Sequence, residues 1–252
     1  MPRFLYHIAL AVAAAACAWS TRAAAHEAPP RTIAFVHASV VPMDRERVLA
    51  DQTVVVVDGK IAEVGPAAKV RVPPGALRVD ARGRWLMPAL SDMHVHVEGE
   101  SWDALLSPEA KAASKNPPFK DFLFPYVANG VTTVQVLSGT HELLPVRGEI
   151  AKGALLAPRL ILARMIDGPD KAWPEPLSTW VSTAEQARDA TRQAKAQGYD
   201  KMKVYSFLTK ETYDAVIATA KEQNMDVVGH IPYDLSVEYV VDSGQKMIAH
   251  TE

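Results

Sequence analysis

Hydrophobic and polar positions alternate in two different rhythms along this chain. Before Trp85, short β-branched runs are separated by turn residues, at Ile33 to Val41, Thr53 to Val57 and Lys60 to Val64. Asp58-Gly59, between the last two runs, is typical of a two-residue β-hairpin. We therefore expect residues 26–85 to form the N-terminal part of a small β-sandwich domain, which needs a packing partner to be stable.

The second rhythm begins at Leu86, where strand-like runs alternate with helix-like segments. The most regular helical segment, Thr209 to Asn224, repeats apolar residues with the helical period from Tyr213 to Ala220. Ser182 with Glu185 forms a capping pair that marks the start of another helix. The strand-like runs are Leu86 to Val97, Val131 to Leu137, Arg159 to Met165, Met202 to Phe207, Met225 to His230 and Lys246 to His250. Strands that alternate with helices predict parallel pairing, in either an open sheet or a (β/α)8 barrel.

Composition and charge narrow the class of protein. The chain has 252 residues, of which 48% are hydrophobic and 22% charged, as is typical of a globular protein with a large core. Its formal net charge of −2, with both signs interspersed, offers no basic surface for nucleic acid. We therefore exclude nucleic acid as a partner. No glycine-rich phosphate-binding loop follows any predicted strand. The sequence therefore lacks the usual signature of a nucleotide-binding open sheet.

The first 25 residues resemble a signal peptide. Arg3 precedes an apolar run, and Ala23-Ala24-Ala25 fits a cleavage site before His26. The run is shorter than the roughly 20 apolar residues that span a bilayer, so we expect no stable membrane span. A lipoprotein lipidated at Cys17 is the less favoured alternative, because the leucine-like residue expected three positions upstream is missing. We expect a secreted or periplasmic protein whose mature form has no cysteine.

Four histidines fall at the ends of predicted strands. His94 and His96 end the first strand two residues apart, a spacing that aims both side chains to the same face. His230 ends the fifth strand and His250 the sixth. Because the carboxyl ends of parallel barrel strands surround one mouth, we expect these imidazoles to meet there. Several imidazoles without cysteine suit a catalytic site for zinc or a similar ion.

Several stretches of the chain resemble the amidohydrolase superfamily. Residues 86–96, LMPALSDMHVH, resemble its signature, in which a proline-started strand ends in HxH. ANGVTTV at 128–134 resembles its second strand, and VGH at 228–230 and IAH at 248–250 resemble its fifth and sixth. The most similar branch is that of the secreted imidazolonepropionase-like and Xaa-Pro dipeptidase-like hydrolases. The resemblance implies a (β/α)8 TIM-like barrel, with strands one to six present in residues 86–252, after the small β-sandwich unit.

The resemblance also implies a role for each strand-end histidine. His94 and His96 would bind the more buried metal ion. His230 and His250 would bind a second ion, or the more exposed side of a single one. We expect one or two divalent ions, with Zn²⁺ as the cofactor.

A lysine completes the implied metal site. In the binuclear members a lysine at the position of Lys203 is carboxylated and bridges two ions. Carboxylation needs the neutral amine, which burial beside a cation favours. Lys201 has the same strand parity, so parity does not separate the two lysines. Lys203 lies within the apolar run whereas Lys201 opens it beside Asp200, and we therefore choose Lys203 as the candidate.

The implied reaction needs one group more than these ligands. A divalent ion activates water and polarises a carbonyl, and a carboxylate moves the proton to the leaving nitrogen. The resemblance places that carboxylate, an aspartate, at the end of barrel strand eight. The sequence stops at Glu252, just past strand six. We therefore interpret it as a fragment without this catalytic residue and expect it to be inactive alone, with a natural truncation as the alternative.

Taken together, these patterns predict a metal-dependent hydrolase of carbon–nitrogen bonds in amides, cyclic amides or peptides, with a small-molecule or dipeptide substrate. A non-catalytic periplasmic metal-binding protein and a phosphotriesterase- or lactonase-like barrel hydrolase are the alternatives. The segment from Asp167 to Trp180 is either a wall of the substrate pocket or a surface loop. We expect structural roles for His37 and His141. Whether the protein forms a homo-oligomer is left open.

Overall fold

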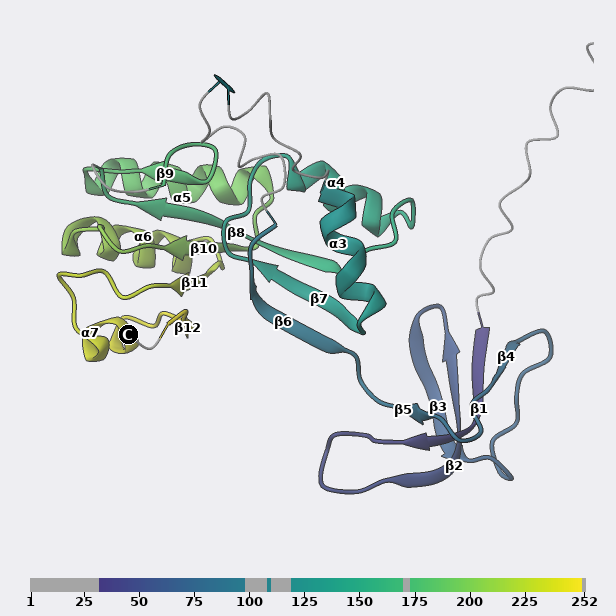
Figure 1. Cartoon of the computed structure of the whole chain (residues 1–252). Coiled ribbons are helices and arrows are strands. Elements are labelled where there is room, and N and C mark those ends of the chain that lie inside the picture. Colours follow the sequence, from purple (N-terminus) through teal and green to yellow (C-terminus); the bar gives the residue numbers. More distant parts are fainter. Residues whose placement is uncertain (1–31, 98–107, 110–118, 170–172, 251–252) are drawn as a thin grey trace, which may run out of the picture. The chain divides into compact units, whose positions relative to one another are not determined.

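The computed structural model describes residues 32–97, 108–109, 119–169 and 173–250. The chain divides after Pro88 into two compact units (Figure 1). The signal peptide expected at 1–25, with Cys17, lies outside the described residues, so export stays a prediction. Within the described ranges, no helix is both long and apolar enough to cross a membrane.

The first unit is a five-stranded mixed sheet. Its strands are β1 (Thr32–Val40), β2 (Leu49–Val57), β3 (Lys60–Pro66), β4 (Leu77–Asp80) and β5 (Trp85–Leu86). The order is β3-β2-β1-β4, and β1 is antiparallel to β2 but parallel to β4 and β5. The hairpin predicted at Asp58-Gly59 is confirmed: β2 pairs antiparallel with β3, and the two residues have φ values of 49° and 75°, as a type I′ turn requires.

The first strand of the second unit begins later than the sequence predicted. Leu86, which was expected to open it, instead pairs with Val40 of β1. Pro88 follows and has no N–H to donate to a neighbouring strand, so a continuous ladder cannot run through it. Strand β6 accordingly starts at Leu90 and runs to Val95.

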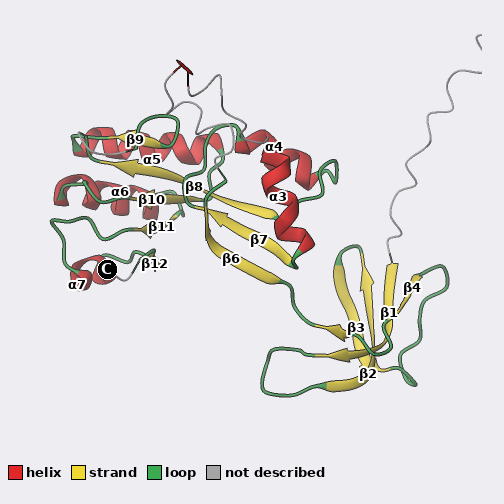
Figure 2. Cartoon of the chain, in the orientation of Figure 1, coloured by secondary structure: helices red, strands yellow, loops and turns green. Residues whose placement is uncertain are grey.

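The second unit is built on a parallel sheet. The strands along its main path are β6 (Leu90–Val95), β7 (Val131–Val136), β8 (Arg159–Asp167), β10 (Lys201–Val204), β11 (Asp226–Gly229) and β12 (Met247–Ile248). Their order is β12-β11-β10-β8-β7-β6, and every pair is parallel. The short β9 (Ser178–Trp180), which the sequence did not predict, pairs with the end of β8. Parallel strands in chain order that alternate with helices (Figure 2) match the expected incomplete barrel.

Helices join these strands. They are α3 (Phe119–Ala128), α4 (Leu143–Ala151), α5 (Ala184–Gln197), α6 (Lys210–Glu222) and α7 (Val237–Asp242). The predicted cap of α5 is wrong by one residue, because Thr183 is the N-cap and its hydroxyl accepts the N–H of Gln186. The N–H of Ser182 is instead donated to the Gln186 side chain, so Ser182 lies one position before the cap.

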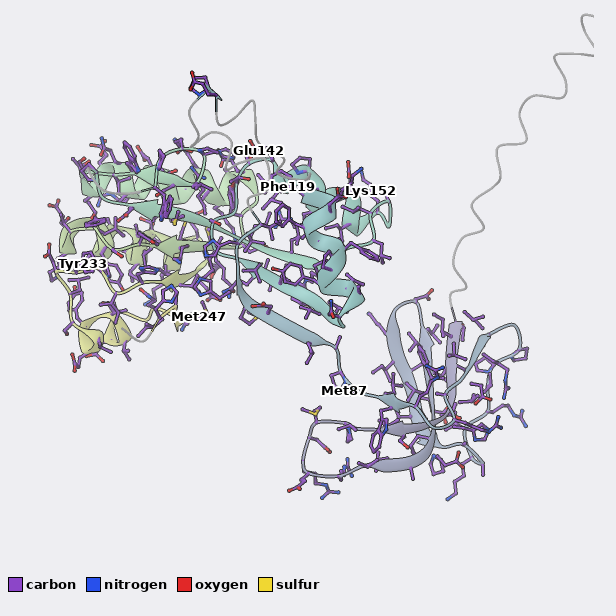
Figure 3. All side chains as sticks on the ribbon, in the orientation of Figure 1. Met87, Phe119, Glu142, Lys152, Tyr233 and Met247 are labelled. Atoms are coloured by element: carbon purple, nitrogen blue, oxygen red, sulfur yellow. The ribbon has the colours of Figure 1, made fainter. Side chains whose placement is uncertain are left out.

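The two sides of the parallel sheet have different surroundings. One side packs on the helices in a large core that includes Leu162 of β8, Val204 of β10 and Tyr213 of α6, which confirms the apolar face predicted for α6. Figure 3 shows side chains filling the space between these strands and helices, with Met247 labelled on β12. The opposite side carries a smaller cluster of Leu137, Ala163 and Val228. In each strand, every second side chain points to this side of the sheet, up to the carboxyl end of the strand.

Candidate functional site

The four strand-end histidines lie together at the carboxyl ends of the parallel strands. His94 is in β6 and His96 follows it, His230 follows β11, and His250 follows β12. The ring centroid of His94 is 5.3 Å from that of His96 and 4.8 Å from that of His250. His230 and His250 are also 4.8 Å apart. We call these four residues the imidazole cluster; it draws on three strands that are far apart in sequence.

Lys203 lies beside the imidazole cluster, whereas Lys201 does not. Lys203 is 1% exposed and lines one cavity together with His96, His230 and His250. Its amine is 5.4 Å from the centre of the Tyr205 ring. Lys201 lies at the other end of β10, where its amine pairs with Asp226 at 3.6 Å. The difference in depth that the sequence predicted is therefore present, although both lysines have the same parity.

Gly229 makes room for the Lys203 side chain. It has a φ of +126°, and a Cβ there would lie 2.7 Å from Lys203 Cδ and 2.2 Å from the carbonyl oxygen of Val204. Real Cβ atoms do not approach other atoms so closely, so only glycine fits at this position. The end of β11 thus packs its backbone directly on β10 beside the lysine.

Burial favours the neutral forms of the titratable groups at this site. Desolvation, followed by the charge of Lys203, lowers the pKa of His230 to about 3. The same two causes, in the same order, lower the pKa of His94. Desolvation lowers the pKa of Lys203 to about 8. His94 and His230 are consequently neutral at pH 7, and the Lys203 amine loses its proton far more easily than an exposed lysine.

Two serines that the sequence analysis missed contact the cluster. The hydroxyl of Ser138 is 2.9 Å from Nδ1 of His96, and the hydroxyl of Ser206 is 2.9 Å from Nδ1 of His230. Each serine is two residues beyond the end of its strand, β7 for Ser138 and β10 for Ser206. Their position at carboxyl strand ends was a signal that could have identified them. These contacts fix the orientation of two imidazole rings.

Apolar side chains form the wall of the cavity, whose volume is about 200 Å³. Met165 of β8, Tyr205, Trp173 and Leu177 contribute to it. The indole N–H of Trp173 donates to the Tyr205 hydroxyl at 3.2 Å, and that of Trp180 donates to the Trp173 carbonyl at 2.8 Å. Trp173 and Leu177 of the segment from 167 to 180 therefore line this cavity, while a role of the segment as a wall of the substrate pocket stays a prediction; residues 170–172 lie outside the described chain.

The donor types fit a divalent metal ion. Imidazole nitrogen is a preferred ligand of zinc, and the cluster presents four imidazoles, of which burial favours the neutral form at His94 and His230, beside a lysine of lowered pKa. Within the described ranges, however, no group of three or more His, Cys, Asp or Glu side chains is arranged so that it could hold an ion. The residues therefore fit a divalent ion in their donor types and in their closeness to one another. His37 and His141 lie outside the cluster, bonded to Asp51 and Tyr199 respectively.

Sequence comparison relates the chain to two kinds of enzyme. An adenine deaminase of Paracoccus denitrificans is 33% identical over 108 residues, which are 43% of this chain and 15% of that protein. A dihydroorotase of Anaeromyxobacter sp. strain K is 37% identical over 94 residues, 36% of this chain and 18% of that protein. The chain thus matches less than a fifth of the length of either relative. No family model matches the chain.

Solved structures share the fold. A putative prolidase of Bifidobacterium longum superposes with a TM-score of 0.71 at 23% identity, over 87% of this chain and 54% of that one. An amidohydrolase superposes with a TM-score of 0.71 at 20% identity, over 86% of this chain and 60% of that one. Identities this low show the fold alone. Together with the curated relatives, these structures support the amidohydrolase superfamily as the family of this chain.

Proposed function

We propose that this chain carries the metal-binding part of a metal-dependent hydrolase that acts on carbon–nitrogen bonds. The observation that supports this proposal best is the imidazole cluster, in which residues from β6, β11 and β12 meet beside buried Lys203. The related proteins are a deaminase, a dihydroorotase and a prolidase by name, which favours carbon–nitrogen bonds and small-molecule or dipeptide substrates. His94 and His230, which burial keeps neutral, can bind a cation without first losing a proton.

Each side chain has a distinct part in this proposal. His94 and His96 hold one side of the metal site, and His230 and His250 the other. A bound divalent ion supplies Lewis-acid polarisation of a carbonyl and acidifies water. Lys203, whose pKa is lowered to about 8 so that its neutral amine forms more easily, would be the residue that carboxylation converts into a further metal ligand.

The apolar wall gives the site its second property. The side chains of Met165, Trp173 and Leu177 line the cavity together with three of the histidines, and Met165 and Leu177 are almost fully buried. A substrate carbonyl that enters between wall and cluster is therefore held in a poorly solvated place, where charges act more strongly than in water. Tyr205 adds a hydroxyl at the edge of this wall, held by the indole N–H of Trp173.

Metal content tests the site. The protein is stripped of metal, reloaded with Zn²⁺, and its zinc measured by elemental analysis. We expect one or two ions per chain, and the loss of at least one in the double variant His94→Ala with His96→Ala. His141→Ala is the matched control because its ring contacts Tyr199 outside the cluster. A double variant that keeps the full zinc content would show that the site is wrongly assigned.

The bridging role of Lys203 has its own test. Lys203→Ala should lose one ion of a two-ion site, and reconstitution of the wild type should need bicarbonate. Lys201→Ala should lose none, because Lys201 pairs with Asp226 at the far end of β10. Equal losses in the two variants would contradict the distinction between these lysines.

Hydrolysis is tested with Xaa-Pro dipeptides, N-acyl amino acids, cyclic amides and lactones. In a version of the protein extended by the strand that the resemblance expects to carry the catalytic aspartate, we expect turnover of carbon–nitrogen bonds that chelators abolish and that the His94→Ala, His96→Ala variant lacks. The 252 residues alone should show no such turnover. Turnover of lactones alone would favour a lactonase-like enzyme instead. Zinc binding by the extended version without turnover of any of these compounds would favour a non-catalytic metal-binding protein.

A further inference from the structure

A buried carboxylate lies one strand away from the imidazole cluster. Asp167 is the last residue of β8, and its side chain is fully buried. Its Oδ1 accepts the backbone N–H of Gly168 at 2.8 Å and that of Phe207 at 2.6 Å. The second bond joins the end of β8 to the turn that follows β10.

That turn, residues 205–207, holds His230. The Ser206 hydroxyl contacts Nδ1 of His230 at 2.9 Å, and the Tyr205 ring lies 4.1 Å from the His230 ring, centroid to centroid. On the other side, the Ser206 carbonyl accepts the N–H of Tyr233 at 2.9 Å. The turn is thus held from both sides. On the β8 side the Ile166 carbonyl accepts the N–H of Tyr205 at 3.0 Å, and Asp167 holds the far end of the turn at Phe207.

Gly168 brings the two segments close enough for this bond. A Cβ at Gly168 would lie 2.0 Å from the carbonyl oxygen of Phe207. No larger residue fits without moving one backbone away from the other. Both residues therefore contact the Phe207 backbone. Asp167 accepts its N–H in a hydrogen bond, and Gly168 packs closely against its carbonyl oxygen.

Burial of the Asp167 carboxyl lowers the stability of the fold. Within the described residues, Oδ2 of Asp167 is buried without a hydrogen-bond partner, and desolvation raises the pKa of the carboxyl. Buried, half-satisfied polar groups destabilise a protein, and those that persist tend to lie at functional sites.

Asp200 provides a contrast on the same two strands. Its Oδ2 also accepts a backbone N–H, that of Leu162 in β8, at 2.8 Å, but Arg147 pairs with the same oxygen at 2.7 Å and the side chain is 43% exposed. Asp200 precedes β10 at its amino end, away from the cluster. A carboxylate that only ties β8 to β10 can therefore be solvated and charge-paired.

We propose that Asp167 is a positioning residue for His230, acting through the turn at 205–207. This proposal rests on the metal site proposed above and adds a residue that lies outside the cluster. Removal of the Asp167 carboxyl should release the Phe207 end of the turn, so that the Ser206 hydroxyl no longer holds the His230 ring firmly for a cation. Removal of the Asp200 carboxyl should loosen the same pair of strands without moving His230.

The experiment compares Asp167→Ala, Asp167→Asn and Asp200→Ala in the full chain. Zn²⁺ affinity is measured by competition with a chromophoric chelator, and stability by chemical denaturation of the metal-free proteins. We expect Asp167→Ala to weaken Zn²⁺ binding by about 10- to 100-fold, the usual effect of losing a supporting partner of a ligand. Asp167→Asn should stay within about threefold of wild type, because its carbonyl oxygen can accept the same two N–H groups. Asp200→Ala should lower stability but leave the affinity unchanged.

A second measurement needs no variant. Binding free energies are reciprocal, so if the turn helps His230 bind Zn²⁺, then Zn²⁺ must stabilise the turn. Amide hydrogen exchange should slow at Phe207 on adding Zn²⁺, and stay unchanged at Leu162, which Asp200 holds. This comparison decides the proposal even if Asp167→Ala does not fold.

Three results would overturn the role of Asp167. They are a wild-type Zn²⁺ affinity in Asp167→Ala, an equal loss of Zn²⁺ affinity in Asp200→Ala, and amide exchange at Phe207 that does not change on adding Zn²⁺. Failure of the metal site itself has a different signature. In that case the wild type binds no Zn²⁺, or binds it equally well in the His94→Ala, His96→Ala variant.

Discussion

A lysine and an aspartate lie at each end of the parallel sheet, but their burial and their polar partners differ between the two ends. At the amino end of β10, Lys201 pairs with Asp226 at 3.6 Å and Asp200 pairs with Arg147 at 2.7 Å, and both side chains reach solvent. At the carboxyl end, Lys203 is 1% exposed and has no ion pair within the described chain, and one oxygen of Asp167 has no partner there. The amino end pairs its charged groups with one another, whereas the carboxyl end buries a lysine amine and one carboxyl oxygen without such partners in the described chain.

This contrast separates stability from chemistry along a single sheet. In barrel enzymes the carboxyl ends of the strands carry the reacting groups, and the amino ends contribute mainly to stability. Lys201 and Lys203 differ by only two positions, yet burial lowers the pKa of Lys203 to about 8. Substitutions at the two ends should therefore have effects of different size, and for the two lysines of different sign.

The largest effect should come from closing the space beside Lys203. Gly229→Ala combines a φ of +126° with a Cβ 2.2 Å from the Val204 carbonyl oxygen. Backbone strain and overpacking should together lower the free energy of unfolding by about 4 kcal/mol. Gly244→Ala, near the amino end of β12, has a φ of +91° but open space around it, and should cost only about 1 to 2 kcal/mol. Chemical denaturation measures both, and equal losses would show that β11 does not pack closely on Lys203.

The next effect should be a gain in stability. Lys203→Met replaces a buried amine by an apolar side chain and should raise the free energy of unfolding of the metal-free protein by about 3 kcal/mol at pH 7. In the wild type the folded-state pKa is about 8 and the unfolded-state value 10.5, so the unfolded chain binds more protons between these pH values. The cost of the buried lysine is therefore full below pH 8 and disappears as the pH rises to about 10.5.

The variant and the wild type should accordingly converge as the pH rises. Their difference in unfolding free energy, measured by urea denaturation from pH 7 to pH 10.5, cancels the contributions of other titrating groups. A difference that does not change over this range would mean that Lys203 titrates like an exposed lysine.

The smallest effect should occur at the other lysine. Lys201→Met removes an ion pair that is partly exposed, and such pairs contribute about 0 to 1 kcal/mol. We expect a loss of that size, reduced further at high salt because the pair is screened. A loss above about 2 kcal/mol in the same denaturation assay would show that the amino end is not the better solvated one.

Much of this architecture could be predicted because it depends on local patterns. The Asp58-Gly59 turn and the apolar face of α6 follow from the conformation and spacing of neighbouring residues. The meeting of His94 with His250 could be predicted as well, because the carboxyl ends of parallel strands share one edge. These features do not depend on how particular side chains pack.

What was missed depends on contacts between distant segments. Leu86 continues the apolar run of the next strand in sequence, yet its backbone pairs with Val40, which only the folded sheet of the first unit determines. Ser138 and Ser206 are ordinary loop residues until a histidine from another strand lies beside them. The carboxyl of Asp167 likewise acquires its role from Phe207, which is far away in the sequence.

The most direct test of the account locates the metal. Crystals of the protein grown with Zn²⁺ would be measured at the zinc absorption edge, where anomalous scattering identifies the ion by position. The account predicts the strongest peak about 2.0 to 2.1 Å from imidazole nitrogens of His94, His96, His230 or His250, in the cavity that Lys203 lines. A strongest peak elsewhere, such as beside His37 and Asp51, or no peak at all, would contradict it.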